Sequence, residues 1–403
     1  MANVSSSNGL EKRPKLRFPG FDEPYVLHRI GDIYAERSER GAADMELLSV
    51  TMNDGVMQRS EIEGKDNSSE DKSSYKVVRK GDMVYNSMRM WQGANGVSPY
   101  DGIVSPAYTV LTAKLPICND YFAALFKNYK LINEFRKNSQ GMTSDTWNLK
   151  YPQIETIKVY LPVIEEQEKI ASILVTLDKR IAAQAALVEQ LKKYKRGVIS
   201  ALLSSKTNPY YSSETWKEVA LCDVASGFEY GMNAATTVYD GSHKYIRITD
   251  IDDNSHLYSQ DVPVSPEGQV DEKFRVREND ILFARTGASV GKSYRYQRSD
   301  GDLYYAGFLI RIHVNSDVNC GYVFQNTLTE AYRRWVLLES ARSGQPGINA
   351  EQYKQYRFLL PPLELQNKIS TLATNLDNLI CKERNLLSQI EQVKIALLQR
   401  LFI

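Results

Sequence analysis

A long helical segment near the middle of the chain most constrains what this protein can fold into. Residues 161–203 begin with Pro162 and the acidic pair Glu165 and Glu166, and then contain no glycine or proline until Gly197. Proline is tolerated at a helix start, and acidic side chains there complement the helix dipole. Apolar residues recur at steps of three and four, which predicts one apolar stripe along a helix. The stripe consists of Ile170, Leu174, Leu177, Ile181, Val188, Leu191, Val198 and Leu202.

A second copy of this segment lies at the end of the chain. The sequences LPVIEEQEKI at 161–170 and LPPLELQNKI at 360–369 share Leu-Pro and the pattern Glu-x-Gln-x-Lys-Ile, and a Leu-Asp pair follows each copy at the same spacing. A helix of about 35–40 residues would span roughly 55–60 Å, which is unusual inside a globular core. Because each helix has an apolar face that needs a partner, we expect an antiparallel coiled coil. A helical hairpin packed inside a larger core is the alternative.

The segments that precede the two helices also repeat each other. The strand predicted at 245–249 matches 47–51 at an offset of 198 residues, and 274–283 matches 76–85 at the same offset. The sequence therefore predicts an internal duplication with an α+β fold: two pseudo-repeated globular domains and two long antiparallel coiled-coil helices. The expected parts are a mobile lead-in at 1–20, a first domain at 21–160, a first helix at 161–204, a linker at 205–215, a second domain at 216–359 and a second helix at 360–403.

Smaller elements of the first domain are predicted from local patterns. Residues 75–84 alternate around Gly81-Asp82, which is typical of a β-hairpin. Residues 103–111 predict one strand and 121–138 predict one helix, and the second domain repeats these two at 303–312 and 322–341.

Composition limits the class of protein. The chain has 403 residues, 42% of them hydrophobic and 25% charged, which is typical of a globular protein of two or more domains. We expect a cytoplasmic protein without a membrane segment, because no apolar run approaches about 18 residues and the N-terminus lacks a hydrophobic signal core. The four cysteines are scattered and fit reduced structural thiols better than a zinc site. The net charge of +1 neither demands nor excludes nucleic acid.

Motifs with catalytic meaning are weak. The stretch Asn208-Pro209-Tyr210-Tyr211 resembles the adenine-holding loop of adenine methyltransferases, but the second proline is missing and no glycine-rich cofactor turn precedes it. Residues 287–292 resemble a phosphate-binding loop that is one residue too short. The four histidines have no metal-ligand spacing, and no Gly-x-Ser-x-Gly elbow occurs. We therefore expect a chain that is not itself an enzyme and that holds no metal.

The duplicated pattern resembles a known family. Leu-Pro-(Pro)-x-Glu-x-Gln-x-Lys-Ile followed by an x-Leu-Asp helix, present twice, is similar to the specificity subunit of type I restriction–modification systems, and 81–110 and 279–292 resemble its recognition-domain hairpins. The resemblance implies two target-recognition domains that each read one half of a bipartite double-stranded DNA target. It also implies helices that set the gap between the half-sites and dock two methyltransferase subunits. Restriction/translocase subunits are implied as further partners. S-adenosylmethionine, ATP and Mg are then expected in those partners, with no cofactor in this chain.

Candidate DNA contacts follow from the chemistry of base and phosphate recognition. Arginine and lysine suit phosphates and guanine, while Asn, Gln, Ser and Thr suit adenine and other base edges. The candidates are, in the second domain, Arg285, Thr286, Ser289, Lys292 and Arg295, in the first domain Asn86, Ser87, Arg89, Trp91 and Gln92, and in the later loops Thr143, Ser144 and Gln345. The neighbouring Asp145, Ser343 and Gly344 are secondary, Arg59 and Arg247 are weaker, and Met88, Met90 and Trp91 could instead pack locally.

Two further expectations concern the hairpin positions and the first long helix. The different residues at matching hairpin positions, Asn86-Ser87 against Ala284-Arg285, predict two half-sites of different sequence. The basic cluster Lys192, Lys193, Lys195 and Arg196 is better explained as a solvated helix face than as a phosphate contact.

A scaffold protein with two ligand-binding modules that never contact DNA is the rival hypothesis. Clustering of Arg285, Lys292 and Arg295 with Arg89 on one concave side would favour DNA, and their scatter would favour the scaffold.

Overall fold

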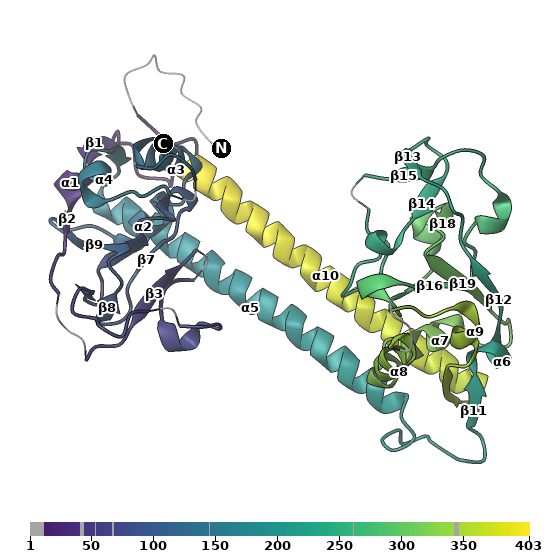
Figure 1. Cartoon of the computed structure of the whole chain (residues 1–403). Helices are drawn as coiled ribbons and strands as arrows, with labels where there is room; N and C mark the ends of the chain where they lie inside the picture. The colour runs from purple at the N-terminus through teal and green to yellow at the C-terminus, as the bar shows by residue number, and fades with distance from the viewer. Residues whose placement is uncertain are drawn as a thin grey trace. The chain divides into compact units, whose positions relative to one another are not determined.

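The chain forms two compact units, which are described separately here. A computed structural model describes residues 12–40, 44–52, 54–66, 68–144, 146–260, 262–341 and 346–403. The first unit comprises residues 1–186 and 384–403, and the second comprises 187–383. Two uninterrupted helices of 39 residues, α5 (Ile164–Leu202) and α10 (Leu363–Leu401), contribute to both units (Figure 1). The two predicted long helices are thus confirmed, and Gly197 does not interrupt the first.

The two helices pack antiparallel within each unit. In the first unit, the start of α5 (Ile170, Leu174) shares a core with the end of α10 (Leu401). In the second unit, the end of α5 (Ile199) shares a core with the start of α10 (Ile369). The expected antiparallel pairing is therefore present in both.

Equivalent ion pairs join the helices in each unit. Asp178 of α5 pairs with Lys394 of α10 in the first unit. In the second, Lys195 of α5 lies 2.6 Å from Asp377 of α10. Both pairs join an Asp from the early part of one copy to a Lys from the late part of the other, as expected when two repeated helices pair antiparallel.

The repeated glutamine explains why the motif recurs at both helix starts. The amide of Gln167 donates to the Pro162 carbonyl (3.0 Å) and accepts from the Cys118 backbone N–H (3.2 Å). Gln366 does the same with Pro361 (2.8 Å) and Asn319 (2.9 Å). Each glutamine therefore ties the first turn of a long helix to the start of a domain helix, which fixes the direction in which the domain leaves the helix.

The first unit is a mixed α+β structure. A four-stranded sheet has the order β2-β9-β6-β7, and three two-stranded sheets pair β1 with β10, β3 with β4, and β5 with β8. Its strands are β1 (Val26–Arg29), β2 (Tyr34–Glu36), β3 (Leu48–Thr51), β4 (Gly55–Gln58), β5 (Lys76–Val78), β6 (Met83–Asn86), β7 (Asn95–Val97), β8 (Gly102–Val104), β9 (Tyr108–Ala113) and β10 (Lys158–Leu161). Its shorter helices are α1 (Ile30–Ile33), α2 (Asn119–Leu125), α3 (Tyr129–Asn138) and α4 (Tyr151–Ile154).

The second unit repeats this order of elements. Its four-stranded sheet has the order β12-β19-β16-β17, which matches β2-β9-β6-β7 strand for strand. Its strands are β11 (Lys217–Ala220), β12 (Ala225–Tyr230), β13 (Thr236–Val238), β14 (Lys244–Ile246), β15 (Val264–Pro266), β16 (Asp280–Ala284), β17 (Ser293–Arg295), β18 (Leu303–Tyr305), β19 (Leu309–Val314) and β20 (Arg357–Leu360). Its shorter helices are α6 (Leu221–Val224), α7 (Cys320–Asn326), α8 (Glu330–Ser340) and α9 (Ala350–Lys354). Duplication with an α+β fold is confirmed.

Three local predictions for the first unit need correction, and two of them fail in the same way in the second unit, where 303–312 is divided between β18 and β19 and 322–341 between α7 and α8. Residues 75–84 do not form a hairpin: β5 pairs with β8, and β6 pairs with β9 and β7. The turn is real, with Gly81 at φ +92° and Asp82 accepting the Arg79 N–H at 2.8 Å, but both strands find distant partners. The strand expected at 103–111 is two strands, and the helix expected at 121–138 is divided, because Asn128 caps a new helix by accepting from Lys130 N–H (2.9 Å).

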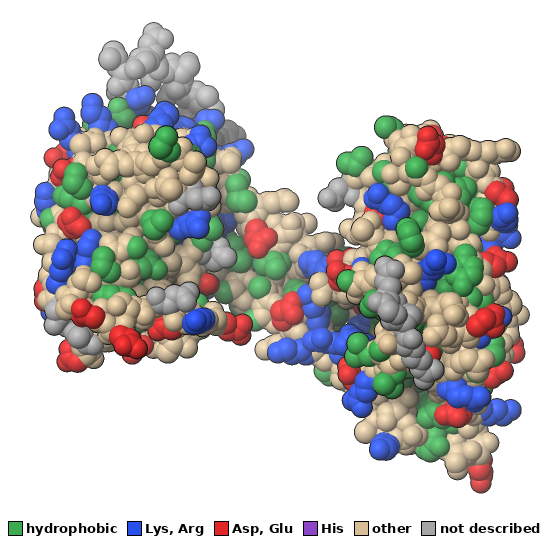
Figure 2. Space-filling view, viewed as in Figure 1, with side chains coloured by type: hydrophobic (Ala, Val, Ile, Leu, Met, Phe, Trp, Pro, Cys, Tyr) green, Lys and Arg blue, Asp and Glu red, His purple; other side chains and the backbone are tan. Residues whose placement is uncertain are grey.

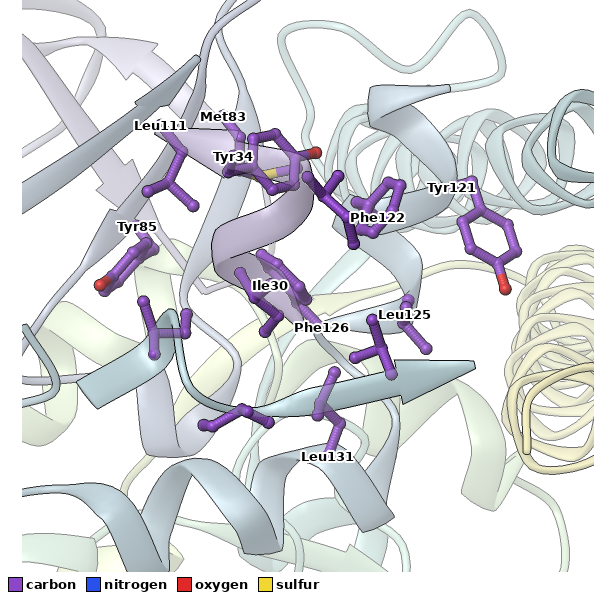
Figure 3. Close-up of a cluster of buried hydrophobic side chains, with 14 of the residues drawn as sticks. Ile30, Tyr34, Met83, Tyr85, Leu111, Tyr121, Phe122, Leu125, Phe126 and Leu131 are labelled. Atoms are coloured by element: carbon purple, nitrogen blue, oxygen red, sulfur yellow. The ribbon is translucent and has the colours of Figure 1, made fainter. Parts of the chain in front are cut away.

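Aromatic side chains hold the sheet of the first unit against its helices. Tyr34, Phe122 and Phe126 are fully buried, and Tyr34 meets Phe122 edge to face at 5.3 Å between ring centroids (Figure 3). Burying one such ring contributes about 2–3 kcal/mol. Met83 and Tyr85 of β6 are buried in the same core, which therefore anchors β6 and the start of the hairpin loop that follows it.

The segment before β1 contacts both long helices from residue 16 onward. The Leu16 N–H donates to the Arg400 carbonyl at the end of α10 (2.9 Å). Arg17 forms an ion pair with Glu166 at the start of α5 (2.8 Å). Residues 12–25 therefore join the ends of both long helices in the first unit.

Candidate nucleic-acid interface

The loop between β6 and β7 is the candidate contact element of the first unit. Backbone hydrogen bonds fix it at Ser87, whose N–H donates to the Ala107 carbonyl (3.1 Å) and whose carbonyl accepts from Leu149 N–H (2.8 Å). The Ser87 side chain is buried and lies 2.8 Å from the Thr109 hydroxyl. Asn86 is half-buried, and its side chain accepts from the Met88 N–H (3.0 Å). Both side chains are thus engaged in shaping the loop.

Arg89 is the exposed cation of this loop. Its guanidinium forms no hydrogen bond or ion pair with any residue that the structure describes, whereas Met90 next to it is buried. Trp91 packs locally, as one of the two sequence interpretations allowed: it meets Trp147 edge to face at 5.2 Å, and its N–H donates to the Met88 carbonyl. Gln92 is half-buried beside it.

A second loop of the first unit lies against the first. It is closed by a bridge between Gln140 and Asn148, and the Trp91–Trp147 contact joins it to the β6–β7 loop. Thr143 and Ser144 are exposed on it. The structure therefore brings Arg89, Thr143 and Ser144 onto two adjacent loops, while Asp145 lies outside the described residues.

The loop between β16 and β17 has the same framework in the second unit. The Arg285 N–H donates to the Phe308 carbonyl (3.1 Å), and its carbonyl accepts from Ile348 N–H (2.9 Å). These bonds repeat those of Ser87, so the predicted equivalence of Ser87 and Arg285 is confirmed. Thr286 forms a bridge with Gly347 and, like Ser289, is half-buried. Gln345, Ser343 and Gly344 lie outside the described residues.

Arg285 has an unusual environment. Its guanidinium lies 4.9 Å from the ring centre of Tyr230, and its Nε atom is buried without a hydrogen-bond partner among the described residues. A cavity of about 510 Å³ is lined by both side chains and by Thr286, Glu339, Gly347, Ile348, Asn349 and Gln352.

The other basic candidates of the second unit are directed elsewhere. Lys292 is only 11% exposed; its ammonium donates to the Ile251 carbonyl (3.0 Å) and pairs with Asp253. Arg295, at the far end of the hairpin, lies over the Phe324 ring of α7 at 5.8 Å. The structure therefore does not gather Arg285, Lys292 and Arg295 at one point.

Several weaker candidates are tied within the fold. Arg59 donates to the Ile62 carbonyl (2.6 Å), and Arg247 forms an ion pair with Asp250 (2.8 Å). Lys192 pairs with Glu189 (2.6 Å), and Lys195 belongs to the pair that joins the helices. These side chains support loops and helices. Within the basic cluster at 192–196, Lys193 and Arg196 are exposed, as expected for a solvated helix face, whereas Lys195 is only 15% exposed in its ion pair.

Tyr230, Asn349 and Gln352 were not among the residues predicted from the sequence. They lie 55 residues before and more than 60 residues after Arg285, so no local motif links them to it. Only the duplication could have indicated Tyr230. It predicts that β12, which ends at Tyr230, takes the place of β2 beside the central strands. Side-chain contacts across the sheet decide which residues meet there.

Charge is mixed on both units. Acidic and basic side chains are interspersed over the face of each unit shown in Figure 2. Within the described ranges, no group of three or more His, Cys, Asp or Glu side chains is placed to hold a metal ion. None of the described helices is both long and apolar enough to cross a membrane.

The geometry defines a duplicated protein with two loop-presenting α+β domains and two long helices. Comparison with known proteins narrows this class. Residues 45–193 and 213–392 match the family described as type I restriction modification DNA specificity domain. The chain therefore belongs to the family of type I restriction–modification specificity subunits.

Individual relatives are distant in sequence. The chain is 23% identical to the type I restriction enzyme StySPI specificity subunit of Salmonella potsdam, over 71% of this chain and 65% of that protein, which is just under two thirds of its length. It is 22% identical to the MjaVIII specificity subunit of Methanocaldococcus jannaschii, over 79% of this chain and 77% of that one. The crystal structure of the S subunit from M. genitalium has a similar fold, with a TM-score of 0.59, 14% identity and coverage of 97% and 99% of the two chains.

Proposed function

We propose that this chain is the non-catalytic DNA-specificity subunit of a type I restriction–modification complex, and that each unit reads one half of a bipartite double-stranded target. The observation that carries the proposal is the repeated loop framework with different side chains. The same pair of backbone hydrogen bonds holds Ser87 in one unit and Arg285 in the other. A constant framework with variable tips is suited to reading two different sequences.

The two long helices would set the gap and receive the partners. A helix of 39 residues extends about 58 Å, compared with about 34 Å between half-sites one helical turn apart. Apolar side chains remain exposed on these helices in the single chain, which supports docking of two methyltransferase subunits. They include Ile173, Leu187, Tyr194, Leu372, Leu379, Val393 and Ile395. Methyl transfer to adenine N6, with S-adenosylmethionine, and ATP-dependent restriction with Mg would then belong to partner subunits.

The scaffold hypothesis draws support from the separation of Arg285, Lys292 and Arg295. Membership of the specificity family and the exposed Arg89 support DNA instead. A domain exchange distinguishes the two: residues 21–160 are replaced by the same domain of a relative, and DNA is selected from a randomised duplex pool with the complex. We expect one half-site to change and the other to stay. An unchanged motif, or the absence of any motif for the parent complex, would support the scaffold.

A further inference from the structure

Arg285 is a half-buried cation that forms no ion pair with any described residue. Two other half-buried basic side chains of its hairpin region and sheet have carboxylate partners, Lys292 with Asp253 and Arg311 with Glu229, whereas Arg295 lies over the Phe324 ring. No described residue supplies a carboxylate to Arg285, and its Nε has no hydrogen-bond partner among them. Because a desolvated polar group without a partner is costly, such a guanidinium is expected where a ligand supplies the acceptor.

Tyr230 fixes the direction of this guanidinium. Its ring centre lies 4.9 Å from the Arg285 guanidinium, within the range of a cation–π contact. The Tyr230 hydroxyl accepts from the Ala350 N–H at the start of α9 (3.2 Å), which holds the ring from the opposite end. An arginine restrained in this way loses less rotamer entropy when it binds, so its planar fork is ready for a two-point contact.

The surroundings favour a neutral acceptor over a phosphate. Glu339 lines the same cavity as Arg285, and its carboxylate accepts from the Gln352 amide (3.2 Å). A phosphate placed here would meet this negative charge, whereas a base edge would not. Guanine presents two acceptors, O6 and N7, in the major groove, and an arginine fork matches them.

The equivalent position in the first unit cannot serve this purpose. Ser87 is buried, and its hydroxyl is bonded to Thr109. The asymmetry makes the inference specific to one half-site.

We propose that Arg285 reads a guanine through O6 and N7 in the half-site bound by the second unit, and that Tyr230 is its positioning residue. The inference rests on the proposed function. It adds the identity of one base, the domain that reads it and the residue that orients the reader.

The test uses the full chain assembled with the methyltransferase subunit encoded with it. Motifs are selected from a randomised duplex pool for the parent complex and for Arg285→Ala, Arg285→Lys, Tyr230→Leu and Tyr230→Phe. Lys273→Ala is the matched control, since Lys273 also lies over an aromatic ring, that of Phe274, and is not a candidate DNA contact. The half-site of the first unit serves as an internal control for folding.

We expect Arg285→Ala and Arg285→Lys to reduce the preference for guanine at one position of one half-site by about tenfold or more. Tyr230→Leu should reduce it less, and Tyr230→Phe less again, because the ring remains but loses its hydrogen bond to the Ala350 N–H. Lys273→Ala should leave it unchanged. For the parent complex, 7-deazaguanine at that position should weaken binding about tenfold, and this measurement needs no variant.

The contrary results are distinct. Equal loss of affinity for all sequences in Arg285→Ala, with a salt dependence reduced by about one ion, would assign Arg285 to a phosphate and overturn the inference. An unchanged motif, or a second half-site without guanine, would also overturn it while leaving the proposed function intact. If the parent complex selected no motif, the proposed function itself would fail.

Discussion

Replacing Arg17 by Met should destabilise the first unit strongly. Glu166 is completely buried at the start of α5, and Arg17 is its ion-pair partner, with Nη2 at 2.8 Å and Nε at 3.0 Å from its oxygens. The Tyr25 hydroxyl donates a third hydrogen bond (3.2 Å). Burial, together with the neighbouring Glu166 carboxylate, raises the pKa of Tyr25 and keeps it a donor. Removing Arg17 would leave a buried carboxylate with one neutral donor.

The expected loss in the free energy of unfolding follows from removing one partner of a buried ion pair. Such a change costs about 3–5 kcal/mol, while replacing both partners by apolar residues is often nearly neutral. The duplication supplies the apolar replacement: Leu365 in the second copy of the motif stands where Glu166 stands in the first, and it packs against the core of the second unit. The double variant Arg17→Met, Glu166→Leu should therefore be less stable than the parent protein by only about 1 kcal/mol.

Hydrogen exchange measured by mass spectrometry resolves this prediction by unit. Peptides that cover β1 and β10 should lose protection in Arg17→Met and regain it in the double variant, while peptides of the second unit should not change. Arg180→Met, an exposed position on α5, is the surface control. The reasoning is refuted if Arg17→Met behaves like the control, or if the double variant is no more stable than the single one.

Three further predictions follow from other contacts. Gln167→Leu should weaken the first unit alone and Gln366→Leu the second alone, each by about 2 kcal/mol, because a backbone carbonyl and N–H lose their partner; equal exchange in both units would contradict this. Burial lowers the pKa of His256 below 6.5, so below that pH the unfolded chain takes up the proton first and the second unit loses stability. His256→Asn, which suits the φ of +56°, should flatten this loss between about pH 7.5 and about pH 5.5 in thermal unfolding, and an unchanged pH profile would exclude His256 as its source. Arg89→Ala should weaken DNA binding for all sequences and lower the slope of log affinity against log salt by about one, whereas a change in the motif would make Arg89 a base reader.

The long-range architecture was predictable because the sequence contains two copies of the same pattern. Two copies of Leu-Pro-x-x-Glu-x-Gln predict two helix starts, and the constant offset predicts that Ser87 and Arg285 occupy matching places. Strand pairing was less predictable. The Gly81-Asp82 turn is local, but the partners of the strands on either side are chosen by contacts with β8 and β9, which no local pattern encodes.

Side-chain roles at the loops depended on contacts remote in sequence. Lys292 has the chemistry of a phosphate contact, yet Asp253 and two backbone carbonyls bind it. Ser87 has the chemistry of a base contact, yet its buried hydroxyl forms a hydrogen bond with the Thr109 hydroxyl. Residue type narrows the candidates, and tertiary packing decides which remain free.

Methylation mapping of genomic DNA by long-read sequencing tests the central proposal most directly. DNA is compared from cells that carry this chain together with its methyltransferase subunit and from cells in which this chain alone is deleted. The account predicts adenine methylation at a bipartite motif with a fixed gap, lost on deletion, with half-sites of different sequence. Identical methylomes in the two strains, with the methyltransferase subunit expressed and active, would contradict it.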